Sequence, residues 1–125
     1  MADFIEKLKT LADTNRLRIL SLIWEAGDLC SCEVEKILDM QQSNTSRQLN
    51  RLQQVGFLHS YKKAQWAHYR IAEEHRPSDS LTAGILSRAR ASMAPLAEDI
   101  EKLHDYRDRG FSCQTIHQWV PFEGG

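Results

Sequence analysis

Two cysteines separated by a single residue, Cys30 and Cys32, are the side chains of this sequence with the most specific chemistry. A thiolate is a soft ligand that suits thiophilic metals and metalloids, and it is also the form of cysteine that reacts with oxidants. A third cysteine, Cys113, lies near the C-terminus. The closely spaced pair is therefore a candidate ligand set or a redox-active pair, and two small buried side chains are the alternative.

A helix is expected to begin at this pair, near Ser31 or Cys32, because apolar residues follow at helical spacing over residues 34–38. Glu33 would lie in its first turn, where negative charge is favoured. Free N–H groups and the dipole at a helix start also favour thiolate, which predicts lowered pKa values for the two thiols. On a regular helix Cys30 and Cys32 would point about 200° apart. We therefore expect Cys30 to lie outside the helix, or ligand binding to unwind the first turn.

A second informative segment is polar and contains no acid. Residues 44–55 predict a helix with one narrow apolar stripe, with Ser43 as its N-cap and Gly56 as its stop. Amide, hydroxyl and guanidinium groups can read base edges or hold phosphates. The candidate DNA-binding residues of this segment are Ser43, Asn44, Thr45, Arg47, Gln48, Asn50 and Arg51.

Residues 57–62 and 66–71 are rich in aromatic and branched residues, and they predict a β-hairpin. Lys62 and Lys63 at its turn are expected to meet phosphate or an adjacent minor groove. Residues 40–72 contain five basic and no acidic residues, although the whole chain carries 16 basic and 17 acidic residues. This asymmetry is typical of a domain that presents one face to a polyanion, with a merely solvated basic face as the alternative.

The segments before this region predict two helices. Residues 3–13 show the pattern of a short amphipathic helix. A second helix, capped by Thr14 or Asn15, is expected to end at Gly27.

The C-terminal part predicts a long helical region after residues 77–80, kinked or divided at Pro95, with Ser92 capping its second half. Its apolar stripe has no core left to cover in so small a domain, which predicts pairing with a second copy. The stripe consists of Leu81, Ile85, Ala89, Met93, Leu96, Ile100 and Leu103. Three residues of the first helix are expected to join it in the interface: Phe4, Ile5 and Leu8.

Three helices, a turn, a polar helix, a hairpin and a helix follow one another in the order of a winged helix-turn-helix domain, a mainly α fold with a small β-hairpin. In that fold the polar helix enters the major groove and the hairpin acts as a wing. Residues 1–108 are predicted to form a DNA-binding domain that dimerises through its N- and C-terminal helices. Residues 109–125 are predicted to form a C-terminal tail without assigned regular structure.

Three linked motifs resemble the ArsR/SmtB-type metalloregulatory repressors. Residues 11–20, LADTNRLRIL, resemble the stretch that opens the family's domain. Residues 42–52, QSNTSRQLNRL, followed by VGFL at 55–58, resemble its recognition helix and exit, and HYRI at 68–71 resembles the end of its wing. The resemblance implies a homodimer that binds palindromic operator DNA and releases it when an inducer binds.

Residues 28–34, DLCSCEV, resemble the cysteine box of the family's arsenic- and heavy-metal-responsive branch. In the arsenite repressors that this box resembles most, a third cysteine occupies the position of Glu35. Trivalent arsenic prefers three thiolates, and a hard carboxylate is a poor substitute. A site made of Cys30, Cys32 and Cys113 would require the tail to fold back, from the same protomer or its partner. The resemblance thus implies trivalent arsenic or antimony as inducer, and chelation that distorts the helix supporting the recognition helix.

Three alternatives stay open at this point. A cadmium or lead sensor would use the same cysteines, and a redox or reactive-sulfur sensor would form a disulfide or polysulfide from them. A metal-buffering or protein-interaction module without DNA binding is favoured only by the acidic remainder of the chain. The carboxylate and histidine ligands of the family's divalent-metal branch are not reproduced by Asp99, Glu101, His104 and Asp108.

The composition and the motifs that are missing exclude other classes. With 42% hydrophobic and 26% charged residues, the chain can build a core. No apolar run approaches the roughly 18 residues of a membrane span, and the N-terminus lacks the pattern of a signal peptide. The sequence therefore predicts a cytoplasmic protein without a membrane partner. Because it has neither a glycine-rich phosphate loop nor a catalytic motif, it also predicts no enzyme and no organic cofactor.

Overall fold

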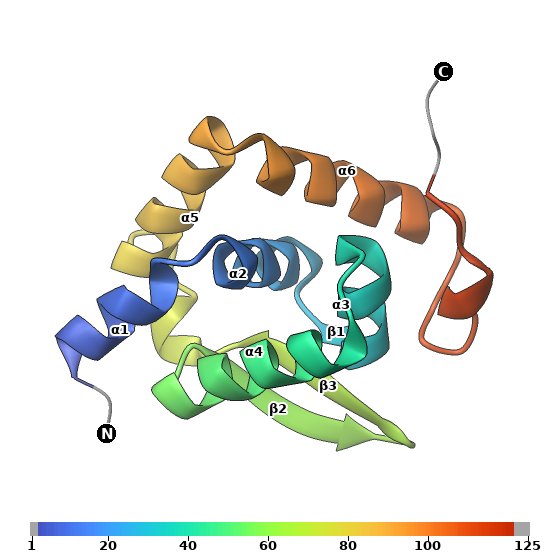
Figure 1. The fold of residues 1–125 in the computed structure, drawn as a ribbon, viewed down its shortest axis with the longest axis horizontal. Coiled ribbons are helices and arrows are strands. Elements are labelled where there is room, and N and C mark those ends of the chain that lie inside the picture. Colours follow the sequence, from blue (N-terminus) through green and yellow to red (C-terminus); the bar gives the residue numbers. More distant parts are fainter. Residues whose placement is uncertain (1–2, 122–125) are drawn as a thin grey trace.

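The structure is a computed structural model and describes residues 3–121 of the chain. Within these residues the helices and the hairpin follow one another in the predicted order, which confirms a mainly helical winged helix-turn-helix fold with a small sheet (Figure 1). The elements are α1 (Phe4–Leu11), α2 (Thr14–Ala26), β1 (Leu29–Cys30), α3 (Ser31–Leu38), α4 (Gln42–Val55), β2 (Leu58–Lys63), β3 (Trp66–Ile71), η1 (Glu73–His75), α5 (Leu81–Ser92), α6 (Ala94–Asp108) and η2 (Ile116–Gln118).

Helix α2 runs through the middle of the domain. Helices α5 and α6 arch over one side of it, while α3, α4 and the sheet lie on the other side (Figure 1). Because it is covered from both sides, α2 is apolar over much of its circumference: Ile19, Leu20, Leu22 and Ile23 are all fully buried. This central helix is the support against which α4 and the C-terminal helices pack.

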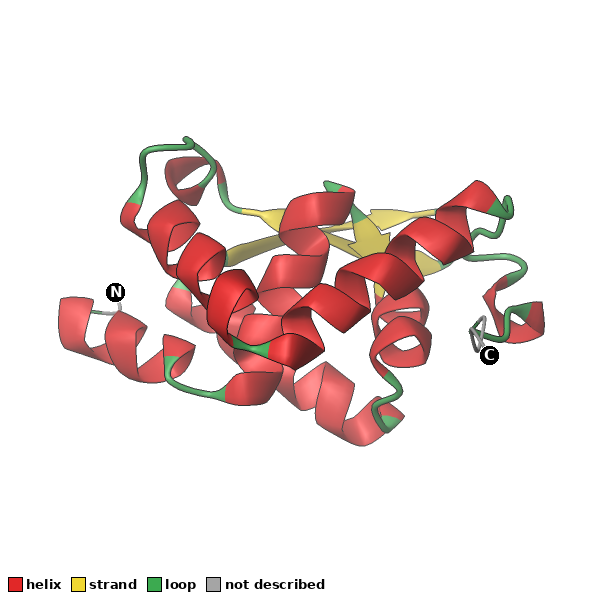
Figure 2. Ribbon diagram, turned by 90° about the horizontal axis from the view of Figure 1, so that it is seen from above, coloured by secondary structure: helices red, strands yellow, loops and turns green. Residues whose placement is uncertain are grey.

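The hairpin is part of a three-stranded antiparallel sheet with the order β1-β3-β2 (Figure 2). Strands β2 and β3 pair from Leu58 opposite Ile71 to Lys63 opposite Trp66. The two-residue strand β1, which the sequence analysis does not predict, adds Leu29 opposite Tyr69 and Cys30 opposite His68. The first cysteine of the pair, Cys30, therefore belongs to a strand of this sheet. We use the name wing for residues 58–71.

Several helix ends differ from the predicted ones by a few residues. Helix α2 is capped by Asp13, which directly precedes the two predicted caps, and the Asp13 carboxylate accepts a hydrogen bond from the Arg16 N–H. The expected break at Pro95 is present, and the proline lies in the first turn of α6, where its missing N–H costs nothing. The N-cap of α6 is Met93 rather than Ser92, whose hydroxyl donates instead to the carbonyl of Arg88.

Helix α4 begins at Gln42 rather than at residue 44, so Ser43 lies inside it and does not cap it. The N-cap is Gln41, whose carbonyl accepts both the backbone N–H and the hydroxyl of Thr45. This contact buries Thr45 completely. The candidate DNA-binding residue Thr45 therefore does not point outward, because its hydroxyl finds a partner in the backbone of the helix start.

The C-terminal apolar stripe is divided between core and surface. Leu96 and Leu103 are at most 1% exposed and belong to the protomer's own core, because α6 packs along α2. The expectation that this stripe has no core to cover is therefore wrong. The apolar side chains of the predicted set that do lie on the surface are Phe4, Ile5, Leu8 and Leu81.

The segment after α6 folds back onto the domain. Trp119 is fully buried, and its indole N–H donates to the Asp105 carboxylate at 3.0 Å. Its ring meets the Tyr106 ring edge to face, with 5.6 Å between centroids. Ile116 in η2 is also buried, and η2 packs against α3. Ile116 and Trp119 of the tail thus belong to the core of the domain. Residues 1–2 of the predicted domain and 122–125 of the predicted tail lie outside the described residues.

Candidate functional site

The junction between β1 and α3 holds Cys30 in a defined position. Cys30 is the N-cap of α3 and has extended backbone angles, φ −82° and ψ 162°. Its N–H donates to the Glu33 carboxylate at 2.9 Å, which is half of a capping box. The prediction that Cys30 lies outside the helix is confirmed. The direction of its side chain is therefore not set by the helical angle between positions 30 and 32.

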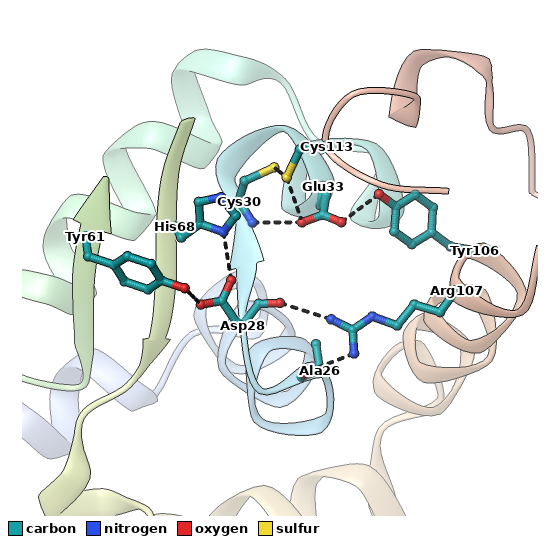
Figure 3. Close-up of polar contacts among 9 residues, drawn as sticks. All are labelled: Ala26, Asp28, Cys30, Glu33, Tyr61, His68, Tyr106, Arg107 and Cys113. Atoms are coloured by element: carbon teal, nitrogen blue, oxygen red, sulfur yellow. Dashed lines mark hydrogen bonds and ion pairs between the residues drawn. The ribbon is translucent and has the colours of Figure 1, made fainter. Parts of the chain in front are cut away.

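Cys113 meets Cys30 because the tail folds back within the same protomer (Figure 3). The two Sγ atoms lie 2.7 Å apart, and the Cys113 Sγ lies 3.3 Å from Glu33 Oε1. Among the described residues, one ligand atom each from Cys30, Glu33 and Cys113 forms a group within 4.8 Å. We call these three residues the thiol–carboxylate group.

Cys32 does not belong to this group. It is half-buried on the first turn of α3, and it lines a surface pocket together with Met40, Ile116 and His117. The structure therefore brings together two of the three predicted ligands, Cys30 and Cys113. The third, Cys32, points away from them and faces the part of the tail that follows Cys113.

Glu33 is the site residue whose contacts sequence reasoning missed. It is only 7% exposed, and its second carboxylate oxygen accepts a 2.6 Å hydrogen bond from the Tyr106 hydroxyl of α6 (Figure 3). A glutamate three residues after a helix N-cap is the spacing of a capping box, so the Cys30–Glu33 contact had a sequence signal. The Tyr106 contact, 73 residues away along the chain, had none.

Burial controls the electrostatics of the group. It raises the pKa of the Cys30 thiol, and the hydrogen bond to Cys113 adds to this effect. Burial likewise raises the pKa of Cys113, and the pKa of Tyr106 is raised by burial and by its hydrogen bond to Glu33. The predicted lowering of the thiol pKa by the helix start is therefore wrong for Cys30, because desolvation and a neighbouring carboxylate outweigh the dipole.

The candidate nucleic-acid face consists of α4 and the wing, which lie together on one edge of the domain (Figure 1). Ser43, Arg47 and Asn50 are exposed on α4, and Lys62 and Lys63 are exposed at the end of β2. These five side chains are exposed toward a polyanion placed along this edge.

The other exposed or half-buried candidate residues of α4 contact neighbouring side chains. Asn44 Oδ1 accepts from Arg47 at 3.0 Å and from Gln48 at 3.3 Å. Gln48 Oε1 in turn accepts from Arg16 of α2 at 2.9 Å. Arg51 forms an ion pair with Glu6 of α1 at 3.2 Å. Contacts with the first two helices therefore hold the α4 side chains in place before any partner binds.

Every helix within the described residues is too short or too polar to span a membrane.

Sequence comparisons match this chain to known regulators. Residues 13–60 match the model of the arsR family of bacterial regulatory proteins. The chain is 30% identical over 106 residues to an arsenic resistance transcriptional regulator of Pseudomonas putida, covering 84% of this chain and 83% of that protein. It is 41% identical over 68 residues to the arsenical resistance operon repressor of Escherichia coli, covering 54% of this chain and 58% of that protein.

Two further matches broaden the comparison. The cadmium resistance transcriptional regulatory protein CadC of Listeria innocua is 35% identical over 63 residues, covering 50% of this chain and 53% of that protein. Among solved structures, reduced HlyU from Vibrio cholerae matches with a TM-score of 0.58 and 26% identity, covering 70% of this chain and 85% of that one.

Proposed function

Because this chain belongs to the ArsR family of bacterial transcriptional repressors, we propose that it binds a palindromic operator as a homodimer and releases it when trivalent arsenic or antimony binds its cysteines. Its relatives are transcriptional regulators, so the prediction that it is not an enzyme is confirmed. The names of these relatives concern arsenic and cadmium resistance, which supports a thiophilic metal or metalloid as the signal.

The observation that carries the inducer proposal is the pair of sulfur atoms from Cys30 and Cys113, 2.7 Å apart beside α3. Arsenous acid reacts with two thiols to form two arsenic–sulfur bonds and two molecules of water. The reaction consumes neutral thiols and releases no net proton, so it suits a buried pair. Cys32 would supply the third sulfur if the first turn of α3 rearranged, since it lies in that turn and faces Ile116 and His117 of the tail.

Release would follow from the position of α3. This helix packs directly against α4, which carries the exposed Arg47 and Asn50. A bound arsenic atom that pulls Cys30, Cys113 and Cys32 together would distort the start of α3. The support of α4 would change with it, and the DNA-facing side chains would lose their arrangement.

The proposed dimer interface is the exposed apolar surface of the terminal helices. Phe4 and Ile5 of α1 and Leu81 of α5 keep 59%, 56% and 60% of their surface exposed. Large apolar side chains so exposed are typical of a surface that a second copy covers.

Replacing Ile5 or Leu81 by aspartate is expected to give a folded monomer, because the charge would be unpaired when the interface forms. Light scattering measures the mass, and circular dichroism checks the helical content. Val120→Asp is the matched control, since Val120 is 67% exposed but lies on the tail. If the Ile5 and Leu81 variants both remain dimeric, the interface lies elsewhere. Leu96→Asp is unsuitable for this purpose, because Leu96 belongs to the core of the protomer.

A second candidate signal is an oxidant or reactive sulfur. Two thiols in contact can lose two electrons and two protons to an oxidant such as diamide and form a disulfide, while the oxidant is reduced to its hydrazine. The contact between Cys30 and Cys113, both free cysteines here, specifically favours this alternative. It would join the tail covalently to the start of α3.

A release titration separates these signals. Fluorescence anisotropy of operator DNA, selected in vitro from random sequence, is followed during addition of arsenite, antimonite, cadmium or tetrasulfide. Arsenite is expected to release the DNA with little change between pH 6 and pH 8. The cadmium response should strengthen as the pH rises, because cadmium must displace protons from thiols whose pKa burial has raised. Release by tetrasulfide with none by arsenite would overturn the metalloid proposal in favour of the redox alternative.

A further inference from the structure

The carboxylate of Asp28 connects the segment that carries Cys30 to the wing (Figure 3). Asp28 lies between α2 and β1, two residues before Cys30. Its Oδ1 accepts a hydrogen bond from His68 Nδ1 at 2.7 Å, and its Oδ2 accepts one from the Tyr61 hydroxyl. One carboxylate thus holds both strands of the hairpin, since Tyr61 belongs to β2 and His68 to β3.

The two wing residues also contact each other. Tyr61 and His68 are directly opposite in the register of β2 and β3, and their rings stack with 5.4 Å between centroids. The Arg70 guanidinium lies 5.7 Å from the centroid of the Tyr61 ring. Lys62 and Lys63, the exposed cations of the wing, follow Tyr61 directly along β2. A displacement of Tyr61 would therefore also displace these lysines, because all three residues belong to β2.

The other end of the connection is held by α6. The Arg107 guanidinium donates to the carbonyls of Ala26 and Asp28, at 2.9 and 3.0 Å. The preceding residue, Tyr106, holds Glu33 of the thiol–carboxylate group. The loop that carries Asp28 is therefore held between α6 and the wing. The strand that follows this loop, β1, contains Cys30 of the thiol–carboxylate group.

Capture of an inducer would change the spacing of the two sulfurs that this segment and the tail hold together. An ion held by two sulfurs through bonds of about 2.3 Å keeps them roughly 3 Å or more apart, even at a right angle. The Sγ atoms of Cys30 and Cys113 are 2.7 Å apart and must separate. Any shift of the Cys30 backbone would be passed to the wing, because that backbone pairs with His68 in the sheet and Asp28 is hydrogen-bonded to the same residue.

We propose that Asp28, His68 and Tyr61 transmit the capture of an inducer between Cys30 and Cys113 to the DNA-binding end of the wing. The inference rests on the proposed function, and it adds a route to the wing beside the one through α3 and α4. Asp28 is a positioning residue on this route, since its carboxylate sets the place of both wing strands relative to β1. When β1 shifts, the contacts of Asp28 with His68 and Tyr61 change, and Lys62 and Lys63 leave their position on the DNA backbone.

The test measures coupling separately from affinity. For each variant, operator dissociation constants are determined with and without saturating arsenite, and their ratio is the coupling factor. Arsenite binding itself is followed by the absorption of the arsenic–sulfur bonds. The first variant is the double replacement Tyr61→Phe with His68→Phe, which keeps both rings. The second is Asp28→Ala, which keeps the backbone carbonyl that Arg107 holds. The controls, Tyr69→Phe and His59→Phe, make the same changes elsewhere in the two strands.

In both variants we expect the coupling factor to fall by about fivefold or more while arsenite still binds. The controls should keep the wild-type factor. A wild-type factor in the folded double variant or in folded Asp28→Ala would overturn the inference and leave the proposed function intact. If the wild-type chain releases operator with neither arsenite nor diamide, the proposed function itself is wrong, and this inference falls with it.

Discussion

Replacing Arg47, Lys62 and Lys63 together by alanine is expected to lower operator affinity by about a hundredfold or more. All three side chains are exposed, and they lie on the α4 and wing edge of the domain. Lysine and arginine contacts with phosphates release counterions, so the slope of log affinity against log salt should become shallower by roughly two to three units. Anisotropy titrations over a range of salt concentrations measure both quantities.

The matched control removes cations from the opposite side of the molecule. Arg88→Ala with Lys102→Ala takes two charges from α5 and α6, which arch over α2 away from α4 (Figure 1). This variant should bind operator almost as the wild type does. Equal affinities of the triple variant and the wild type would mean that the DNA-binding surface is not formed by α4 and the wing. Arg51 is left in place because it forms an ion pair with Glu6.

Replacing Cys30 or Cys113 by serine is expected to weaken arsenite-driven release at least tenfold, about 1.4 kcal/mol, while operator binding persists. Serine has nearly the size of cysteine, but its hydroxyl is a hard ligand that stays protonated, so the fold is kept and the soft ligand is lost. The contact between these two sulfurs makes both necessary for any arsenic atom held there. The arsenite concentration at half release is the quantity to compare.

Cys32→Ser decides whether the site uses two or three sulfurs. If the first turn of α3 rearranges to bring Cys32 in, this variant should also lose its response to arsenite. It should still respond to a methylated or phenyl arsenical, which needs only two sulfurs. Ser31→Ala, on the same turn, is the control and should behave as the wild type. An undiminished arsenite response in Cys113→Ser would contradict the proposed site, because the tail thiol would then be dispensable.

The amino-acid pattern alone predicts the order of the helices and the hairpin, the polar character of α4 and the position of Cys30 outside α3. Each of these follows from local properties: apolar spacing, stop signals such as Gly27 and Gly56, and the angle between two residues on one helix turn. Local signals also explain the small errors. The start of α4 and the N-caps of α2 and α6 differ from the predicted ones by a residue or two, which is the usual spread for helix ends.

The surroundings of the cysteines depend on tertiary packing, which the local sequence pattern does not predict. Cys30 and Cys113 are 83 residues apart, and they meet because burial of Ile116 and Trp119 turns the tail back onto α3. The same packing sets Tyr106 against Glu33 and excludes water, so the thiol pKa rises although the helix start alone predicts a fall. It also places Leu96 in the core, because α6 lies along α2. The spacing of residues along the chain predicts which side chains lie on the same face of a helix. Which other element packs against that face depends on the tertiary fold of the whole chain.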